Sequence, residues 1–178
     1  GAGDYAHAPL QNVVEDTFSS DPKTEDESNY FFKNYYGLTI GDDIILVGEQ
    51  GFIAWSPDYM SFWTKDGGTS KNLRGTVHGN SIYAIVGDNG TILTSDNGST
   101  WTSRADGRTD NLSEVTFGNN TFIAVGDNGT IRTSSDNGTT WDNRTSGTTK
   151  FYGVTFGKNT FIAVGDNGTI RTSSDNGT

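Results

Sequence analysis

The sequence contains no cysteine, which excludes disulfides, thiol catalysis and cysteine-ligated zinc. Proline is also scarce, at 3 of 178 residues, and no Gly-X-Y period occurs, so a collagen-like chain is excluded. No apolar run approaches the ~18 residues of a membrane-spanning helix. Basic residues are few: 12 Lys and Arg stand against 22 Asp and Glu, a net charge of -10. A negative net charge opposes binding to a phosphate backbone, so a nucleic-acid partner is not expected. A membrane span is not expected either, because a long apolar run is missing.

Glycine and aromatic residues are what the sequence has in quantity. There are 24 glycines, and aromatic residues make up 12% although hydrophobic residues make up only 31%. A disordered chain is poor in aromatic residues, so this composition does not indicate disorder. Glycine together with aromatic and β-branched residues is typical of short strands joined by tight turns. The composition indicates an acidic, β-rich protein.

The sequence repeats itself every 39 residues. Gly48, Gly87, Gly126 and Gly165 each end a hydrophobic segment that finishes in Val-Gly, and neighbouring members are 39 residues apart. The segments 115–139 and 154–178 differ only at Asn119, which is Lys158 in the second. Such near identity suggests recent duplication, and therefore an architecture that accepts repeated units.

Each unit contains four short runs with strand character, separated by turn residues. In the third unit these runs end at Phe117, span 121–125, span 130–134 and span 140–144. The Asn-Gly pairs between them favour the positive φ angles of tight hairpin turns. Four antiparallel strands in about 40 residues is the period of a β-propeller blade. We therefore predict an all-β fold, a β-propeller of four-stranded antiparallel blades with about 3.7 blades in the chain.

The turn before the fourth strand carries the most specific motif. Ser134-x-Asp136-x-Gly138-x-Thr140-Trp141 is a full Asp-box pattern, and residues 94–101 nearly match it. The first copy, residues 56–63, is degraded, and the last runs from Ser173 to Thr178. The chain thus resembles the Asp-box, or bacterial neuraminidase repeat, β-propellers, including those similar to photosystem II assembly factors. The resemblance covers about residues 34–178 and implies a fold, not a function, since this superfold hosts many functions.

The residues of the box are expected to be structural. A turn carboxylate can accept backbone N–H groups, glycine adopts conformations closed to other residues, and the tryptophan is expected to fill the space between blades. The structural set comprises Asp58, Asp96, Asp136, Asp175, Trp63, Trp101 and Trp141.

Residues 1–33 form a separate acidic segment in which a strand at 13–18 is a candidate for closing the propeller. The repeats then occupy 34–71, 72–110, 111–149 and 150–178, the last of which lacks its fourth strand. Three arrangements follow: a self-closed ring of four blades, a larger ring completed by another chain, or part of a longer protein. An unpaired final blade exposes a sheet edge, so a homo-oligomer is predicted.

Enzymatic activity is not expected. The resemblance implies that a sialidase would need three clustered arginines, but Arg132 and Arg171 are repeat-equivalent and belong to separate blades. His7 and His78 are the only histidines, and no Gly-x-Ser-x-Gly motif occurs. The recurrent Asp-Asn-Gly triplets lack the further oxygen ligands and terminal glutamate of a calcium loop. We expect no metal and no cofactor.

A binding role fits the sequence better, on the side where blades are connected. Aromatic residues beside acidic and amide groups suit sugar rings or protein segments, although the same aromatics could simply pack the blades. The candidate ligand-binding residues are Tyr35, Arg74, Arg104, Arg108, Asp88, Asp127, Asp166, Phe151 and Tyr152.

Three functions are compatible with these patterns. The first is an extracellular or virion-surface recognition module for glycan or protein. The second is a self-assembling structural protein whose last blade is completed by another chain through the amino-terminal segment. The third is an intracellular complex-assembly factor, which is what the photosystem resemblance would imply.

Overall fold

The computed structural model describes residues 33–145 and 147–177, in which the regular elements are β-strands and one-turn 3-10 segments. The first sheet contains β1 (Tyr35–Ile40), β2 (Ile44–Gly48), β3 (Phe52–Ser56) and β4 (Trp63–Asp66). The second contains β5 (Leu73–Gly79), β6 (Ile82–Gly87), β7 (Ile92–Ser95) and β8 (Thr102–Ser103). The third contains β9 (Leu112–Gly118), β10 (Thr121–Gly126), β11 (Ile131–Ser134) and β12 (Asp142–Asn143). The fourth contains β13 (Phe151–Gly157), β14 (Thr160–Gly165) and β15 (Ile170–Ser173).

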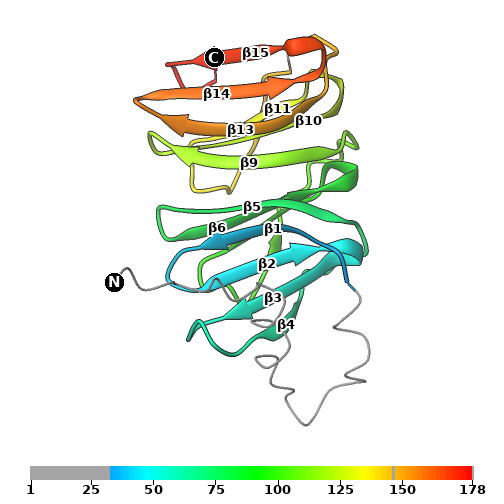
Figure 1. Cartoon of the computed structure of the whole chain (residues 1–178), viewed down its shortest axis with the longest axis vertical. Helices are drawn as coiled ribbons and strands as arrows, with labels where there is room; N and C mark the ends of the chain where they lie inside the picture. The colour runs from blue at the N-terminus through cyan, green and yellow to red at the C-terminus, as the bar shows by residue number, and fades with distance from the viewer. Residues whose placement is uncertain (1–32, 146, 178) are drawn as a thin grey trace, which may run out of the picture.

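Each sheet is an antiparallel meander in which the strands pair in chain order. The orders are β1-β2-β3-β4, β5-β6-β7-β8, β9-β10-β11-β12 and β13-β14-β15. The four sheets stack face to face in sequence order, with the first and last at opposite ends of the stack (Figure 1). This arrangement confirms the predicted β-propeller of four-stranded blades, with three complete blades and three strands of a fourth. The proposed closing strand at 13–18 lies outside the described residues.

A 3-10 turn joins the second and third strands of every blade. These turns are η3 (Glu49–Gly51), η4 (Asp88–Gly90), η5 (Asp127–Gly129) and η6 (Asp166–Gly168). The middle residue is left-handed in each case, as at Asn89, with φ of 58°. Gly90 follows with φ of 66°, and a Cβ there would lie 2.1 Å from the carbonyl oxygen of Arg108. Conformation and space therefore both require the glycine, whereas the left-handed middle position is asparagine in three blades and Gln50 in the first.

The hydrophobic core lies between blades, in three separate interfaces. In the interface between the second and third blades, Ala84 and Val86 of β6 pack against Phe122 and Ala124 of β10, with Trp141 beside them. The interface between the first two blades contains Ile45, Val47, Tyr83 and Ile85, with Trp101 against them. The third interface is built by Ile123, Val125, Phe151, Phe161 and Ala163. Alternate residues of β6 and of β10 thus face opposite neighbours, as in a strand buried on both sides.

The Asp-box aspartate organises the turn before the fourth strand. Asp136 accepts hydrogen bonds from the backbone N–H of Thr140 at 2.9 Å, from its hydroxyl at 2.6 Å and from the Ser134 hydroxyl at 2.8 Å. Asp58 accepts the N–H groups of Met60 and Ser61 in the first blade. Partial burial of Asp136 opposes ionisation, but these hydrogen bonds outweigh it and lower the pKa of the carboxyl.

The second blade departs from the predicted pattern, because Asn97 and not Asp96 holds its turn. The Asn97 side-chain oxygen accepts the N–H groups of Ser99 and Thr100, both at 2.9 Å. The same oxygen also accepts the hydroxyl of Ser95 at 3.2 Å. Ser95 pairs with Tyr83 in the sheet, just as Ser134 pairs with Phe122 in the third blade. The segment from this serine to the tryptophan is one residue shorter than in the third blade. That deletion moves the capping position onto Asn97 and leaves Asp96 exposed.

Replacing Asp136 with alanine is expected to destabilise the chain by about 1 kcal/mol, the usual net value of turn hydrogen bonds of this kind. Replacing Asp96, the residue that the sequence pattern selects, is expected to change stability by less than about 0.5 kcal/mol, as for other exposed sites. Urea unfolding followed by tryptophan fluorescence measures both. Equal losses for the two variants would contradict the assignment of the capping role to Asn97.

Candidate functional site

The inner strand of every blade carries a β-bulge at its start, and the bulged residue is presented at one edge of the molecule. Each ladder shifts register there, between Tyr35 and Gly37 in the first blade and between Phe151 and Gly153 in the fourth. The same shift occurs in the second and third blades. A bulge re-aims a side chain out of the regular alternation. The four bulged residues, Tyr36, Arg74, Ser113 and Tyr152, together with the acidic residues of the neighbouring turns, Glu49, Asp88, Asp127 and Asp166, are called the rim below.

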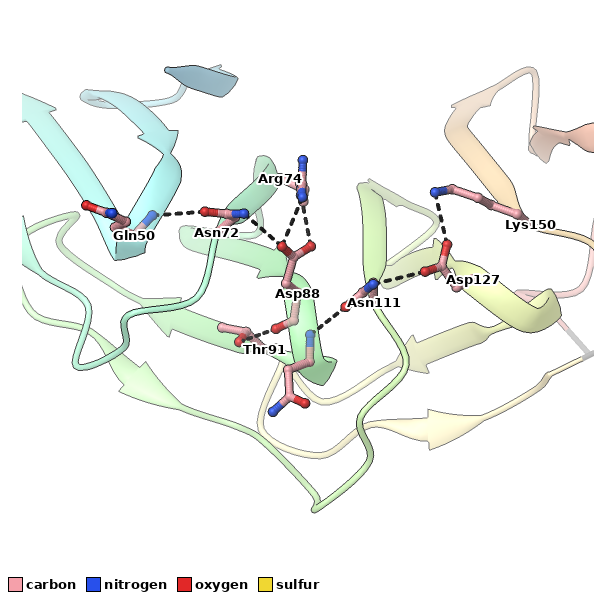
Figure 2. A network of polar contacts seen from close by, with 9 residues as sticks. Gln50, Asn72, Arg74, Asp88, Thr91, Asn111, Asp127 and Lys150 are labelled. Atoms are coloured by element: carbon pink, nitrogen blue, oxygen red, sulfur yellow. Dashed lines mark hydrogen bonds and ion pairs between the residues drawn. The ribbon is translucent and has the colours of Figure 1, made fainter. Parts of the chain in front are cut away.

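Asparagine side chains link the turns along the rim. The Asn72 side-chain oxygen accepts the backbone N–H of Gln50 at 3.0 Å, and its amide group donates to Asp88 at 2.9 Å. Asn111 repeats the arrangement one blade later, accepting from the N–H of Asn89 at 2.8 Å and donating to Asp127 at 3.0 Å. Each asparagine therefore joins the turn of the preceding blade to the carboxylate of its own blade (Figure 2).

A bidentate ion pair stands at the second blade. Arg74 donates through Nε and Nη2 to the two oxygens of Asp88, both at 2.9 Å (Figure 2). The guanidinium also lies over the ring of Tyr36, 4.8 Å from its centroid. The hydrogen bonds from Arg74 hold the pKa of the Asp88 carboxyl below its ordinary value, and those bonds in turn raise the pKa of Arg74. This forked, stacked arrangement is one that lysine would not reproduce.

The fourth blade has a lysine where the first three blades have asparagine. Lys150 Nζ lies 3.1 Å from Asp127 Oδ1 and 5.2 Å from the ring centroid of Tyr152. The Tyr152 hydroxyl donates to Asp166 Oδ1 at 2.7 Å, an interaction that raises the pKa of the phenol. Lys150, Asp127 and Asp166 line a polar cleft at this edge together with Asn128, Thr148, Thr149 and Asn167.

The structure thus brings Arg74, Asp88, Asp127, Asp166 and Tyr152 of the sequence candidates together on the rim. Tyr36 and Tyr152 are 43% and 56% exposed, whereas Phe151 is fully buried between blades and has no surface to offer a ligand. Tyr35, 39% exposed, packs edge-on against Phe52.

Arg104 and Arg108 have other roles. Arg104 donates through Nε to Thr94 at 2.9 Å and lines a separate cleft beside the outer strands. Arg108 pairs with Asp106 at 3.1 Å, and the same carboxylate lies 2.9 Å from Arg132, whose side chain is only 3% exposed. Asp106, in the connection between the second and third blades, therefore neutralises the buried guanidinium of Arg132 on β11.

The asparagines that hold the rim were not among the sequence candidates. Their signal in the sequence is an asparagine shortly before each of the first three inner strands, at 34, 72 and 111. Asn34 donates to Glu49 at 3.0 Å, as the other two donate to Asp88 and Asp127. The asparagines alone do not indicate a site, because the turns that they bind lie about 22 residues away in the sequence.

Glu114 occupies a position on β9 at which the other inner strands have glycine. A Cβ on Gly75 of the neighbouring strand would lie 2.7 Å from the Glu114 carboxylate. Burial raises the pKa of this carboxyl, and its hydrogen bond from the Val115 N–H, at 3.0 Å, compensates only in part.

Glutamine at position 114 is expected to stabilise the chain near pH 7. A raised folded-state pKa means that Glu114 contributes stability below its unfolded pKa and loses that contribution as pH rises through the folded value. The Glu114→Gln variant and the parent should therefore converge in acid and separate toward neutral pH, with the variant melting higher. Thermal melts across pH 3–8 measure the difference, and a constant offset over that range would contradict it.

The described residues contain no group of three or more His, Cys, Asp or Glu side chains suited to a metal ion. Among the same residues, no helix is long and apolar enough to cross a membrane.

The histidine of the second blade has a packing contact. His78 packs against Tyr83, with ring centroids 4.3 Å apart.

Comparison with known proteins defines the class through structure. No protein-family model matches the chain, and no curated protein matches it in sequence. The solved structure of YCF48 bound to D1 peptide is similar with a TM-score of 0.59 and 16% identity over 79% of this chain and 50% of that one. The computationally designed Ika4 protein is similar with a TM-score of 0.65 and 14% identity over 80% and 91%. The WD40 propeller domain of Doa1 gives a TM-score of 0.63 and 12% identity over 82% and 52%.

These likenesses show a β-propeller fold. The chain spans about half the length of the YCF48 and Doa1 structures that it matches. The finer resemblance to Asp-box propellers remains a prediction from the motif.

Proposed function

We propose that this chain is a non-enzymatic recognition module that binds a protein segment along the rim. The observation that carries the proposal is the exposure of Tyr36 and Tyr152 at equivalent bulges, each beside a cation and a carboxylate. Tyrosine and arginine are enriched among the residues that dominate protein interfaces, because they combine a large apolar surface with a polar end. The rim is also held in place by its own hydrogen bonds and ion pairs, which lowers the ordering cost of binding.

The geometry supports an extended ligand. Equivalent positions recur on four consecutive blades, so the polar and aromatic groups form a row and not a single enclosed pocket. YCF48, which shares the fold, is described as bound to a peptide. An oligosaccharide would use the same tyrosine rings and carboxylates. Binding of a glycan is distinguished from binding of a peptide by the experiment below.

Selection of a displayed peptide library on the immobilised chain provides the probe for a test. The selected peptides are expected to bind at least ~10-fold more weakly to Tyr36→Ala, Arg74→Ala and Tyr152→Ala, the loss of an interface hot spot. Tyr59→Ala is the matched control, since Tyr59 is 52% exposed in the first Asp-box turn, outside the rim. Peptides that bind all three rim variants as tightly as the parent would refute the site. A glycan array in parallel identifies the alternative if a sugar, and no peptide, shows the same dependence.

As a second function we propose head-to-tail self-assembly of this chain, on the observation that β14 and β1 carry exposed apolar residues. Val164 and Ile162 of β14 are 46% and 38% exposed, whereas Val125 and Ile123, the equivalent residues of β10, are 1% and 3% exposed under the fourth blade. Leu38 of β1 is 58% exposed at the other end. Contact between two different exposed faces would be a heterologous interface, which closes into a ring or extends into an open filament.

Light scattering on the eluting protein tests assembly directly. A mass above 19.1 kDa that returns to the monomer value in Val164→Lys supports head-to-tail contact through the fourth blade. A parent chain that stays monomeric at high concentration contradicts it. Tyr152→Ala is the control, because Tyr152 is an exposed residue of the rim, whereas Val86 is fully buried and a lysine there would disturb the fold.

A further inference from the structure

The junction between the third and fourth blades lacks one of the asparagine links of the rim. Asparagine precedes the inner strand in each of the first three blades, and Lys150 stands at the equivalent position in the fourth. The Lys150 carbonyl accepts the N–H of Asp166 at 3.0 Å, which is the regular backbone contact of the rim. The Asn111 carbonyl accepts the N–H of Asp127 in the same way, at 2.9 Å. The replacement therefore alters the side chain and leaves the backbone in place.

An asparagine side chain at this position makes two hydrogen bonds of opposite direction. The Asn111 oxygen accepts the backbone N–H of Asn89 at 2.8 Å, and its amide group donates to Asp127 Oδ2 at 3.0 Å (Figure 2). Lysine has no acceptor, and the Lys150 ammonium lies 3.1 Å from the other oxygen of Asp127, Oδ1. The lysine side chain therefore reproduces neither hydrogen bond.

Both partners of the asparagine side chain are present at this junction and lack it. The backbone N–H of Asn128, one repeat after Asn89, finds no acceptor in the part of the chain that the structure describes. Asp166 Oδ1 accepts the Tyr152 hydroxyl at 2.7 Å, whereas Asp166 Oδ2 accepts no hydrogen bond from any described residue. These are the donor and the acceptor that an asparagine joins one repeat earlier.

A polar cleft of about 490 Å³ contains both groups, since Asn128 and Asp166 are among its lining residues. Asp127 and Asp166 bring two negative charges to the cleft and Lys150 one positive charge, so a carboxylate is not favoured there. A hydroxyl has its donor and acceptor on a single oxygen, whereas the two partners here bind separate atoms of one group. The uncharged carboxamides of asparagine and glutamine have an acceptor oxygen and a donor nitrogen side by side.

We propose that this cleft binds the carboxamide of an asparagine or glutamine side chain in the protein segment that binds along the rim. The ligand oxygen accepts the N–H of Asn128, and the ligand nitrogen donates to Asp166 Oδ2. The inference rests on the proposed function for its ligand and names one side chain of that ligand. Two hydrogen bonds of ordinary strength correspond to about 10-fold in affinity.

Amide hydrogen exchange, measured by NMR on the isotope-labelled chain, tests the missing hydrogen bond without a ligand. The N–H of Asn89, bound to Asn111, is expected to exchange at least ~10-fold more slowly than that of Asn128. Lys150→Asn should slow the exchange of Asn128 to the rate of Asn89, because it restores the regular asparagine, whereas Lys150→Met should not. Equal rates for the two N–H groups in the parent chain would contradict the inference.

The peptides selected on the rim, in the experiment described above, supply the ligand for a binding test. They are expected to contain an asparagine or glutamine whose replacement by alanine weakens binding at least ~10-fold. Aspartate or lysine at the same peptide position should bind no better than alanine, because aspartate meets two carboxylates and lysine has no acceptor. Fluorescence anisotropy with labelled peptides measures these affinities on the 178-residue chain.

Two substitutions of Lys150 separate the carboxamide site from the rest of the rim. Lys150→Asn fills the position with the chain's own carboxamide, so the preference for the carboxamide peptide over its alanine counterpart should fall below ~2-fold. Lys150→Met removes the same charge but supplies no acceptor, so the preference should stay near ~10-fold. Both variants lose the ammonium beside Tyr152, so the ratio of the two affinities, and not the overall affinity, is the measurement.

The results distinguish this inference from the proposed function. Rim-dependent peptides that need no asparagine or glutamine would overturn the inference and leave the proposed function standing. A preference that is unchanged in Lys150→Asn, or an aspartate or lysine peptide that binds as tightly, would overturn it too. If no selected peptide depends on Tyr36, Arg74 or Tyr152, the proposed function fails and the inference fails with it.

Discussion

Replacing Phe122 with alanine is expected to lower the free energy of unfolding by about 3–5 kcal/mol, the range for a fully buried phenylalanine. Phe122 is 0% exposed and packs between the rings of Phe117 and Trp141, with centroids 4.6 Å and 6.2 Å away. The loss falls on the interface that couples the second blade to the third. Because repeat arrays are stabilised by contacts between neighbours, the unfolding transition should also broaden. Urea unfolding, followed by circular dichroism, measures both effects.

Phe161→Ala is the matched comparison, since Phe161 is the same residue one repeat later. It is 4% exposed and stacks on Phe156 at 4.5 Å, but its other side faces the open cleft and not a tryptophan. Fewer neighbours are lost and the site can relax, so the cost should be no more than about 3 kcal/mol and below that of Phe122→Ala. Equal costs would show that the third interface is packed as tightly as the second.

Alanine in place of Gly126 is expected to destabilise the chain by more than about 3 kcal/mol, because the main chain itself must move. A Cβ at this position would lie 1.9 Å from the carbonyl oxygen of Asn111. That carbonyl accepts the N–H of Asp127 at 2.9 Å, the bond that holds the rim turn against the start of β9. Relief of the overlap therefore opens the rim at the third blade. Thermal unfolding measures the stability loss, and any ligand of the rim should bind this variant more weakly.

Gly157→Ala provides the control. No atom lies within 4 Å of a Cβ built at Gly157, although the equivalent glycine of the third blade, Gly118, is 2.1 Å from the Phe156 ring. The Gly157 variant should melt within a few degrees of the parent, which corresponds to ~1 kcal/mol or less for a domain of this size. A large loss at Gly157 would mean that its surface is covered in solution.

The sequence was sufficient to predict the blades because two local signals agree. Val-Gly segments recur at a fixed spacing, and Asn-Gly pairs stand where left-handed turns are needed, as at Asn89 and Asn128 with φ of 58° and 54°. Both signals depend on backbone geometry within a few residues, so they survive without any knowledge of neighbouring blades.

The rim was predicted only in part, because its contacts join blades. Phe151 and Tyr152 look equally suitable in the sequence, and only the bulge determines that the first is buried and the second exposed. Lys150 could not be paired with Asp127 before the fourth blade was placed beside the third. In the second blade a one-residue deletion moved the capping role from Asp96 to Asn97, a change that a motif aligned on its tryptophan conceals.

The third and fourth blades contain two almost identical stretches of sequence, 115–139 and 154–178, which differ only at Asn119 and Lys158. Near identity of this kind points to duplication of a repeat, and a further duplication would add a whole blade. A blade inserted at this point would present the same valine and isoleucine face that its neighbour already accepts, and would accept the next blade in the same way. A change of length by one whole blade would therefore require no new kind of interface.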